Sequence, residues 1–181
     1  MTSPYLKLSP FSGNENLLNV VIETPKGSRN KYAFDEEVGL FRYKNVLPEG
    51  SSFPFDFGFI PNTLAEDGDP LDVLLLLDEP VFTGCLVEAR AIGIMEAEQT
   101  EAGKTVRNDR LLAVSVTSIM HKDIKTLKDL PKPLLEQIEH FFKAYNEGMG
   151  RKFKVIENGS PAKALKLVKE AEKTYRKHKE N

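Results

Sequence analysis

The sequence predicts a mainly β fold with two helices in its last third. Up to about residue 118, short apolar segments alternate with turns that contain glycine or proline, a pattern typical of an antiparallel barrel or a sandwich. Beyond residue 129 the apolar residues recur at helical spacing instead. The chain has 181 residues, of which 40% are hydrophobic, so it suffices for one sizeable core. We therefore expect a single α+β domain over residues 1–181.

The strands are predicted from the spacing of apolar runs and turns. Residues 1–17 are rich in proline, serine, glycine and asparagine and predict an extended amino-terminal arm. Strands are then expected at 18–23, 31–35, 40–46, 53–60, 71–77, 84–96 and 110–118. In the segment 53–60 four phenylalanines stand at alternate positions, so their rings share one face. We interpret that face as core, and a strand that also walls a ligand cleft is the alternative.

Two amphipathic helices are expected in the last third. Leu134, Ile138 and Tyr145 lie at helical spacing, and the pattern ends near Gly148. Ser160 and the proline after it predict the start of the second helix, as an N-cap followed by proline at the first helical position. The lysines of this second helix are mixed with glutamates, which indicates a solvated surface rather than a nucleic-acid interface.

The composition excludes several classes of protein. The formal charge is −2, which provides no global field for nucleic acid or an anionic membrane. Cys85 is the only cysteine, so an internal disulfide and a multi-cysteine metal cluster are excluded. The amino terminus lacks the pattern of a secretion signal, and no apolar run is long enough to span a membrane. We expect a cytoplasmic protein without a nucleic-acid or membrane partner.

A cluster of carboxylates carries the strongest chemical signal. Asp67, Asp69 and Asp72 lie within six positions, directly before an apolar run that predicts a buried strand. A polar turn with exposed aspartates would be the ordinary interpretation of the first two. Asp72, however, is the second residue of the expected strand, where an unpaired charge is costly. Because carboxylate oxygens are the ligands that hard divalent cations prefer, we predict an open metal site shared with a phosphorylated substrate.

Further charged residues stand beside the predicted strands. Lys31, Lys44 and Arg110 are candidate phosphate-binding cations. Glu23, Glu98 and Asp109 are further candidate carboxylates. Each of them alone is more typical of a solvated side chain, so they support a site only as a set.

Several segments together resemble one family. They are Val21–Pro25, Asn30–Tyr32, Phe53–Pro61, Glu66–Leu74 with the string DGDPLDVL, Arg110–Val114 and His140–Tyr145. On these segments the chain resembles the soluble, Mg²⁺-dependent inorganic pyrophosphatases, as a divergent bacterial branch. The resemblance implies an oligonucleotide-binding (OB)-like antiparallel β-barrel flanked by helices. It also implies hydrolysis of pyrophosphate to two phosphates by a metal-activated water, without a covalent intermediate.

The resemblance implies roles for the acidic residues and for the cofactor. Asp67 and Asp72 would ligate the metals, and Asp69 would be both a ligand and the proton acceptor for the attacking water. Glu23 would act through water on an outer metal. Several Mg²⁺ ions would bind in each active site, with Mn²⁺ as an expected substitute.

The remaining implied roles concern substrate and assembly. Lys31, Lys44 and Arg110 would hold phosphate oxygens, and Tyr145 would donate a hydrogen bond to the departing phosphate. The family also implies a homo-oligomer, a hexamer, to which the helix with His140 would contribute an interface.

The chain departs from the family pattern at four positions in the expected cleft. Ala33 stands where a glutamate is common, Lys44 where an arginine is usual, Phe57 where a tyrosine is frequent, and Asn146 where a lysine is frequent. Arginine and lysine differ in how they bind phosphate, because only arginine binds in bidentate fashion.

The loop over residues 96–109 is longer than in the family, so its residues can be aligned with the family positions in more than one way. Counting back from Arg110 puts Asn108 at the position of a metal-binding aspartate, with Asp109 beside it. Counting forward from Gly93 places Glu98 next to another such position. We predict Glu98 and Asp109 as substitute ligands.

Two other functions are compatible with these residues. One is a barrel that has lost catalysis and binds an oligonucleotide or another phosphorylated ligand through Lys31 and Lys44. The retained acidic cluster argues against it, since carboxylates repel a polyanion. The other is an enzyme of the same kind that acts on a nucleotide or a longer polyphosphate.

Overall fold

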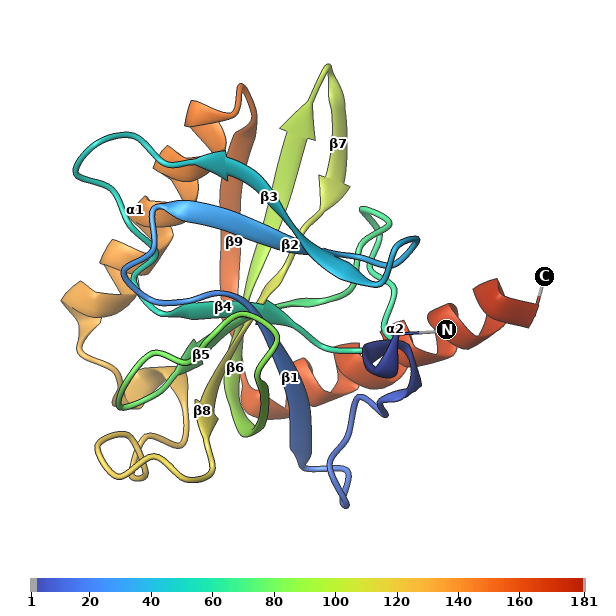
Figure 1. Ribbon diagram of the computed structural model, residues 1–181. Coiled ribbons are helices and arrows are strands. Elements are labelled where there is room, and N and C mark those ends of the chain that lie inside the picture. Colours follow the sequence, from blue (N-terminus) through green and yellow to red (C-terminus); the bar gives the residue numbers. More distant parts are fainter. Residues whose placement is uncertain (1–2, 181) are drawn as a thin grey trace.

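The computed structural model describes residues 3–180, and strands make up most of it. Five of them pair in a closed ring (Figure 1). Around the ring the order is β1 (Leu17–Thr24), β4 (Asp56–Phe59), β5 (Asp72–Leu76), β8 (Arg110–Ser115) and β6 (Leu86–Glu101), and β6 pairs again with β1. The expected mainly β, OB-like fold is confirmed.

Four other strands complete the β structure. β2 (Asn30–Asp35) and β3 (Leu40–Val46) form a separate hairpin that crosses in front of the ring in Figure 1. β7 (Lys104–Arg107) and β9 (Lys152–Gly159) both pair with the long strand β6.

The helices lie on different sides of the sheet. α1 (Lys132–Gly148) packs beside β9, and α2 (Pro161–Glu180) packs against β6 and extends to the right in Figure 1. The backbone N–H of Lys163 donates to the hydroxyl of Ser160 at 3.3 Å, as expected for an N-cap. Two short 3-10 helices, η1 (Pro4–Lys7) and η2 (Leu127–Asp129), complete the fold. Within residues 3–180 none of the helices combines the length and the apolar character that a membrane crossing requires.

The structure corrects three expectations about the strands. The ring is not purely antiparallel, because β5 and β8 run parallel. The segment 53–60 contributes only four residues to β4, although all four of its phenylalanine rings are buried. β7 and β9 were not expected, since both are short or rich in charged residues and lie at the outside of the sheet.

The amino-terminal arm is less extended than expected. Within its described part, residues 3–17, one 3-10 turn interrupts it. Tyr5 of that turn packs edge-on against the rings of Phe34 and Phe41 and donates a hydrogen bond to the carbonyl of Gly84 at 2.9 Å. The arm is therefore tied to the β2–β3 hairpin.

Two apolar clusters share the strands of the ring. On β5, Leu74 and Leu76 face the cluster that α1 closes, whereas Val73 and Leu75 face the cluster that α2 closes. Alternate side chains of a strand point to opposite faces, so β5 is apolar on both. Asp72 is two positions before Leu74, so its side chain points to the same face and lies at the rim of the cluster that α1 closes.

Candidate active site

The loop that carries the aspartates is a closed turn between Thr63 and Leu71. The buried hydroxyl of Thr63 accepts a hydrogen bond from the backbone N–H of Leu71 at 3.0 Å and donates one to the carbonyl of Ile60 at 2.7 Å. Gly68 has φ +93°, a conformation that glycine adopts without steric cost. The backbone N–H of Asp69 donates to the carboxylate of Asp67 at 3.2 Å. The turn thus presents Asp67 and Asp69 on a fixed backbone.

Asp72 and Arg110 are brought together by the parallel pairing of two strands. They are direct partners in the register of β5 and β8. Arg110 Nη1 lies 2.6 Å from Asp72 Oδ2, and the arginine side chain is only 7% exposed. The guanidinium also lies over the rings of Phe57, Phe142 and Phe153, at 5.5 to 5.9 Å from their centroids. A buried cation is therefore paired with one of the three aspartates.

Lys31 and Glu23 form a second enclosed ion pair. Lys31 Nζ lies 2.9 Å from Glu23 Oε2 and 4.2 Å from the centroid of Phe57. The other carboxylate oxygen of Glu23 accepts a hydrogen bond from the backbone N–H of Phe34 at 2.7 Å. β1 and the β2–β3 hairpin hold this pair beside the Asp72–Arg110 pair.

One cleft of about 870 Å³ gathers most of the predicted residues. Its lining includes Glu23, Lys31, Lys44, Asp67, Asp69, Asp72, Arg110 and Tyr145. Phe53, Phe57 and Phe59 also line it, so this segment contributes both to the core and to a cleft wall. Residues that are up to 122 positions apart in sequence, from Glu23 to Tyr145, therefore share one solvent-accessible space.

The enclosed aspartates are shifted towards their protonated form. Burial raises the pKa of Asp72 to about 6, although the charges of Arg110 and Lys31 act in the opposite direction. Burial also raises the pKa of Asp67; the N–H of Asp69 opposes that effect, and the carboxylate of Asp69 adds to it. Positive charge placed in the cleft would favour the ionised form of both groups.

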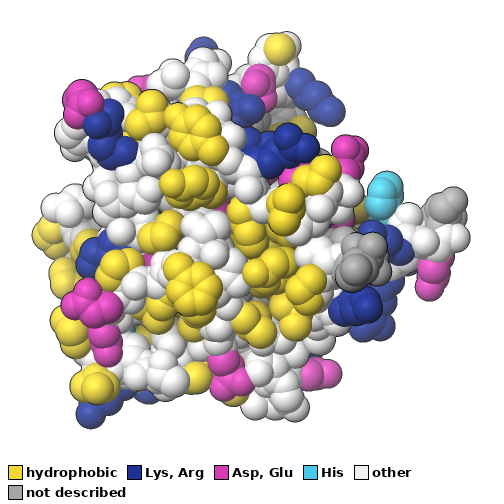
Figure 2. Space-filling model, in the orientation of Figure 1, with side chains coloured by type: hydrophobic (Ala, Val, Ile, Leu, Met, Phe, Trp, Pro, Cys, Tyr) yellow, Lys and Arg dark blue, Asp and Glu magenta, His cyan; other side chains and the backbone are white. Residues whose placement is uncertain are grey.

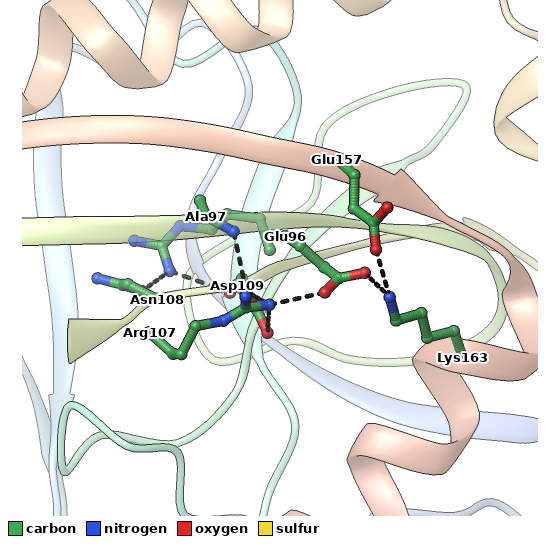
Figure 3. Close-up of polar contacts among 8 residues, drawn as sticks. Glu96, Ala97, Arg107, Asn108, Asp109, Glu157 and Lys163 are labelled. Carbon is green, nitrogen blue, oxygen red and sulfur yellow. Dashed lines mark hydrogen bonds and ion pairs between the residues drawn. The ribbon is translucent and has the colours of Figure 1, made fainter.

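Glu98 and Asp109 do not line the cleft. The side chain of Gln99 on β6 lines the cleft. Neighbouring side chains of a strand point to opposite faces, so Glu98 points away from the cleft. The carboxylate of Asp109 accepts a hydrogen bond from the N–H of Ala97 at 2.9 Å and lies 2.9 Å from Arg107 (Figure 3). The predicted ligand role of Glu98 and Asp109 has no geometric support.

Figure 3 shows where Asp109 lies instead. Arg107 reaches both Asp109 and Glu96, and Lys163 of α2 lies between Glu96 and Glu157. Glu96, Arg107, Asp109 and Lys163 line a second cavity of about 550 Å³, between β6 and α2. Burial by itself would raise the pKa of Glu96, but the two cations outweigh it and hold that pKa below its ordinary value.

Several cleft residues were not identified from the sequence. They are Glu36, Gln99, Glu101, Arg151, His178 and Lys179. The alternation along β6 could have pointed to Gln99, had the strand been extended to Glu101. No local pattern distinguishes His178 or Lys179, because the end of α2 reaches the cleft only through the tertiary packing.

All four departures from the family pattern lie at the cleft. Ala33 and the buried Phe57 line it without adding a polar group. Asn146 is 1% exposed and donates to the carbonyl of Phe142 at 2.8 Å, so its amide hydrogens stabilise α1. Lys44 lines the cleft from the exposed edge of β3.

The donor set of the cleft fits a hard divalent cation. Asp67, Asp69 and Asp72 offer only carboxylate oxygens, the ligand type that Mg²⁺ and Mn²⁺ prefer. Between Ser3 and Glu180 no three His, Cys, Asp or Glu side chains form a ready-made ligand set. Asp72 and Glu23 are paired with Arg110 and Lys31. A metal ion that binds Oδ2 of Asp72 would displace the Arg110 guanidinium from that oxygen.

The cleft also fits an anionic ligand. Arg110 Nε is buried and has no hydrogen-bond acceptor among the described residues. A buried donor without an acceptor is costly, and a phosphate oxygen would satisfy it.

Comparison with known proteins agrees with this geometry. The family model for inorganic pyrophosphatase matches residues 20–176. An inorganic pyrophosphatase of Synechocystis sp. is 36% identical over 167 residues, which cover 92% of this chain and 96% of the relative. That of Halalkalibacterium halodurans is 38% identical over 160 residues, with 88% and 96% covered.

Solved structures show the same relationship. The inorganic pyrophosphatase of Thermus thermophilus superposes with a TM-score of 0.85 at 33% identity, over 95% of this chain and 99% of that one. The enzyme of Neisseria gonorrhoeae also superposes with a TM-score of 0.85, at 34% identity, over 95% and 98%. Family model, sequence relatives and fold thus agree with the resemblance inferred from the motifs. The chain belongs to the inorganic pyrophosphatase family, whose members hydrolyse pyrophosphate to phosphate.

Proposed function

We propose that this chain hydrolyses pyrophosphate to two phosphates with Mg²⁺ bound by Asp67, Asp69 and Asp72. The observation that carries the proposal is that these three carboxylates and the cations Lys31 and Arg110 line one cleft. Carboxylates alone would repel the substrate, and cations alone would bind it without activating water. The two sets side by side suit a reaction in which an anionic substrate and a divalent cation share oxygen atoms.

The cations of the cleft bind and orient the substrate. Arg110 would donate from Nε and Nη to one phosphate, and its packing between aromatic rings limits the positions of the guanidinium. Lys31 and Lys44 approach from the hairpin side, and the hydroxyl of Tyr145 approaches from α1. Tyr145 would donate a hydrogen bond to the departing phosphate.

Asp69 is the proposed proton acceptor. It is exposed on the loop, whereas Asp67 and Asp72 are partly buried, so Asp69 is the most accessible of the three to a water molecule that attacks phosphorus. A divalent cation, when bound, would supply a lowered pKa for that water and neutralise charge on the phosphoryl group. Glu23 would support the site through water, and Mn²⁺ would replace Mg²⁺ at the same carboxylates.

The test is phosphate release from pyrophosphate by the purified protein. Asp67→Asn and Asp69→Asn should each lower kcat/KM by at least roughly a hundredfold, the scale typical of lost charge stabilisation or base catalysis. Asp123→Asn is the matched control, because Asp123 is exposed and does not line the cleft. No release above blank with either Mg²⁺ or Mn²⁺ would refute the proposal.

The substrate range and the cell compartment belong to the same proposal. We place the enzyme in the cytoplasm, where pyrophosphate is its substrate, with no nucleic-acid or membrane partner. Parallel assays with tripolyphosphate and a nucleoside triphosphate would show whether the cleft accepts longer chains.

We also propose a homo-oligomer, with the hexamer as the expected state. Support comes from exposed apolar side chains on the β2–β3 hairpin, where Leu40 is 65% and Tyr43 58% exposed. Figure 2 shows hydrophobic side chains spread over the face that carries this hairpin. Light scattering coupled to size-exclusion chromatography would measure the mass, and a mass of one chain, 20.3 kDa, would refute the proposal.

A further inference from the structure

Arg110 is held by acceptors of two kinds. Its Nη1 forms an ion pair with the charged carboxylate of Asp72, 2.6 Å from Oδ2. The same nitrogen donates to the side-chain oxygen of Asn108 and to the carbonyl of Asp109 at 3.2 Å, both of which are neutral. Only the Asp72 contact competes with a divalent cation for its carboxylate.

Asn108 is itself fixed on both sides. Its Nδ2 donates to Oε1 of Gln99 at 2.8 Å, and both amides are buried, with 6% and 9% exposure. The Arg110 guanidinium can only donate, so the oxygen of the Asn108 amide must face it and the nitrogen must face Gln99. The result is a hydrogen-bonded chain from Gln99 through Asn108 to Arg110.

The backbone of Ala97 on β6 also holds the segment that carries Asn108. The N–H of Asn108 donates to the carbonyl of Ala97 at 2.9 Å, and the carboxylate of Asp109 accepts from the N–H of Ala97 (Figure 3). Asn108 and Arg110 are two positions apart, so both point into the cleft while Asp109 points away. The position of the Asn108 oxygen is therefore set by two independent anchors.

We infer that Asn108 is a positioning residue that keeps the Arg110 guanidinium directed into the cleft after Asp72 has released it. The inference rests on the proposed function, in which Asp72 turns to a metal ion and Arg110 to phosphate. Without a second acceptor, the released guanidinium would rotate about its side-chain torsions and lose the fixed direction that a bidentate phosphate contact needs.

The neutrality of Asn108 is part of the same role. In the absence of a metal ion, a carboxylate at this position would form a buried ion pair with Arg110 and would repel a phosphate group beside it. An amide oxygen accepts the hydrogen bond and leaves the positive charge available to the substrate. Because Asn108 and Gln99 are neutral, the Arg110 side of the cleft keeps its positive charge for phosphate. The acidic side, formed by Asp67 and Asp69, lies opposite.

The test is the affinity for inorganic phosphate, measured by isothermal titration calorimetry without added divalent metal and again with Mg²⁺. Asn108→Ala should weaken the phosphate Kd about tenfold with Mg²⁺, a typical effect for one lost contact to a charged group, and less without metal, because Asp72 then still holds Arg110. Without metal, Asn108→Asp should weaken the phosphate Kd more than Asn108→Ala does, because the new carboxylate pairs with Arg110. The KM for pyrophosphate should rise in Asn108→Ala. The matched control is Asn158→Ala, which removes an exposed hydrogen bond to Glu139.

A double-mutant cycle separates positioning from general destabilisation. In an Arg110→Lys background, Asn108→Ala should change the phosphate Kd less than twofold, because the fork that Asn108 directs is gone. Equal effects in the two backgrounds would overturn the inference. So would a metal-free phosphate Kd for Asn108→Asp that matches the wild type, and this variant preserves the shape of the side chain even if Asn108→Ala unfolds.

The outcome is distinct from that for the proposed function. A wild-type chain that binds phosphate but releases none from pyrophosphate would refute the proposed activity, while the phosphate titrations would still decide the role of Asn108.

Discussion

Asp72 and Arg110 face each other across the one parallel strand pair of the described sheet, with Oδ2 and Nη1 2.6 Å apart. The pair links the acidic loop to the cationic wall of the cleft. Because both side chains are enclosed, each is the main compensation for the charge of the other.

The first prediction concerns the stability of this pair. Arg110→Leu should lower the free energy of unfolding by about 3 kcal/mol at pH 8, because it leaves Asp72 ionised and without its partner. Urea unfolding followed by circular dichroism measures the change. The double variant Asp72→Leu with Arg110→Leu should lose less than the sum of the two single variants. A strictly additive result would mean that the ion pair contributes nothing.

Metal binding should stabilise the folded chain, and the stabilisation should depend on the aspartates. A cation that binds the folded state only raises the unfolding temperature, and at a hundred times Kd the gain is about 2.7 kcal/mol. We expect a clear rise with Mg²⁺ in the wild type and in Asp123→Asn. Differential scanning calorimetry should show a much smaller rise in Asp67→Asn and Asp72→Asn. An equal rise in all four proteins would place the metal elsewhere.

Acid should weaken the attachment of α2 to the sheet. The pKa of Glu96 lies below its ordinary value, because Lys163 and Arg107 outweigh the effect of burial. A lowered carboxyl pKa gives stability that is present above the ordinary value and is lost as the pH falls through the lowered one. Thermal unfolding between pH 7 and pH 3 should therefore show a loss that the Glu96→Gln variant lacks.

At neutral pH the same variant should already be less stable. Lys163 is 46% exposed, so solvent screens part of the interaction, and we expect Glu96→Gln to cost between about 1 and 3 kcal/mol. Glu170→Gln is the matched control on α2, since its contact with Lys166 is exposed and should contribute less than about 1 kcal/mol. Equal costs in the two variants would contradict the role of Glu96.

Gly58 should be irreplaceable for a backbone reason. A Cβ atom there would lie 2.1 Å from the carbonyl oxygen of Val21 on β1, and a backbone atom cannot yield as a flexible side chain does. Gly58→Ala should cost about 3 kcal/mol or more. In contrast, Gly148 in α1 has open space around its Cβ position, so Gly148→Ala should be neutral or gain roughly 0.5 kcal/mol. Chemical denaturation of both variants measures the change in the free energy of unfolding. A small loss in Gly58→Ala would disprove the close approach of the two backbones.

Local pattern was enough to find the main elements. The alternation of phenylalanines, the apolar run after Asp72 and the helical spacing from Leu134 each follow from the periodicity of one element. β9 was not predicted from the sequence, because only Phe153 of its residues is buried and its pattern therefore resembles that of a polar loop. Where one face is exposed and charged, local sequence carries little information about pairing.

For the candidate site, too, some residues could be predicted from local sequence and others could not. The loop with Asp67 and Asp69 was identified because its residues are neighbours in the chain, and the string that they form is specific to the family. The ligand role predicted for Glu98 and Asp109 lacks support because a shift of one residue in a strand moves a side chain to the other face. Sequence spacing near a loop of uncertain length does not determine that register.

The sequence by itself determined the acidic loop, the family and the two helices, because these depend on residues close together in the chain. The tertiary structure alone decided that β5 and β8 run parallel with Asp72 opposite Arg110. It also decided that Gln99 and Asn108, rather than their acidic neighbours, face the cleft. Both are matters of strand register, which long-range hydrogen bonding and the packing of two apolar clusters fix together.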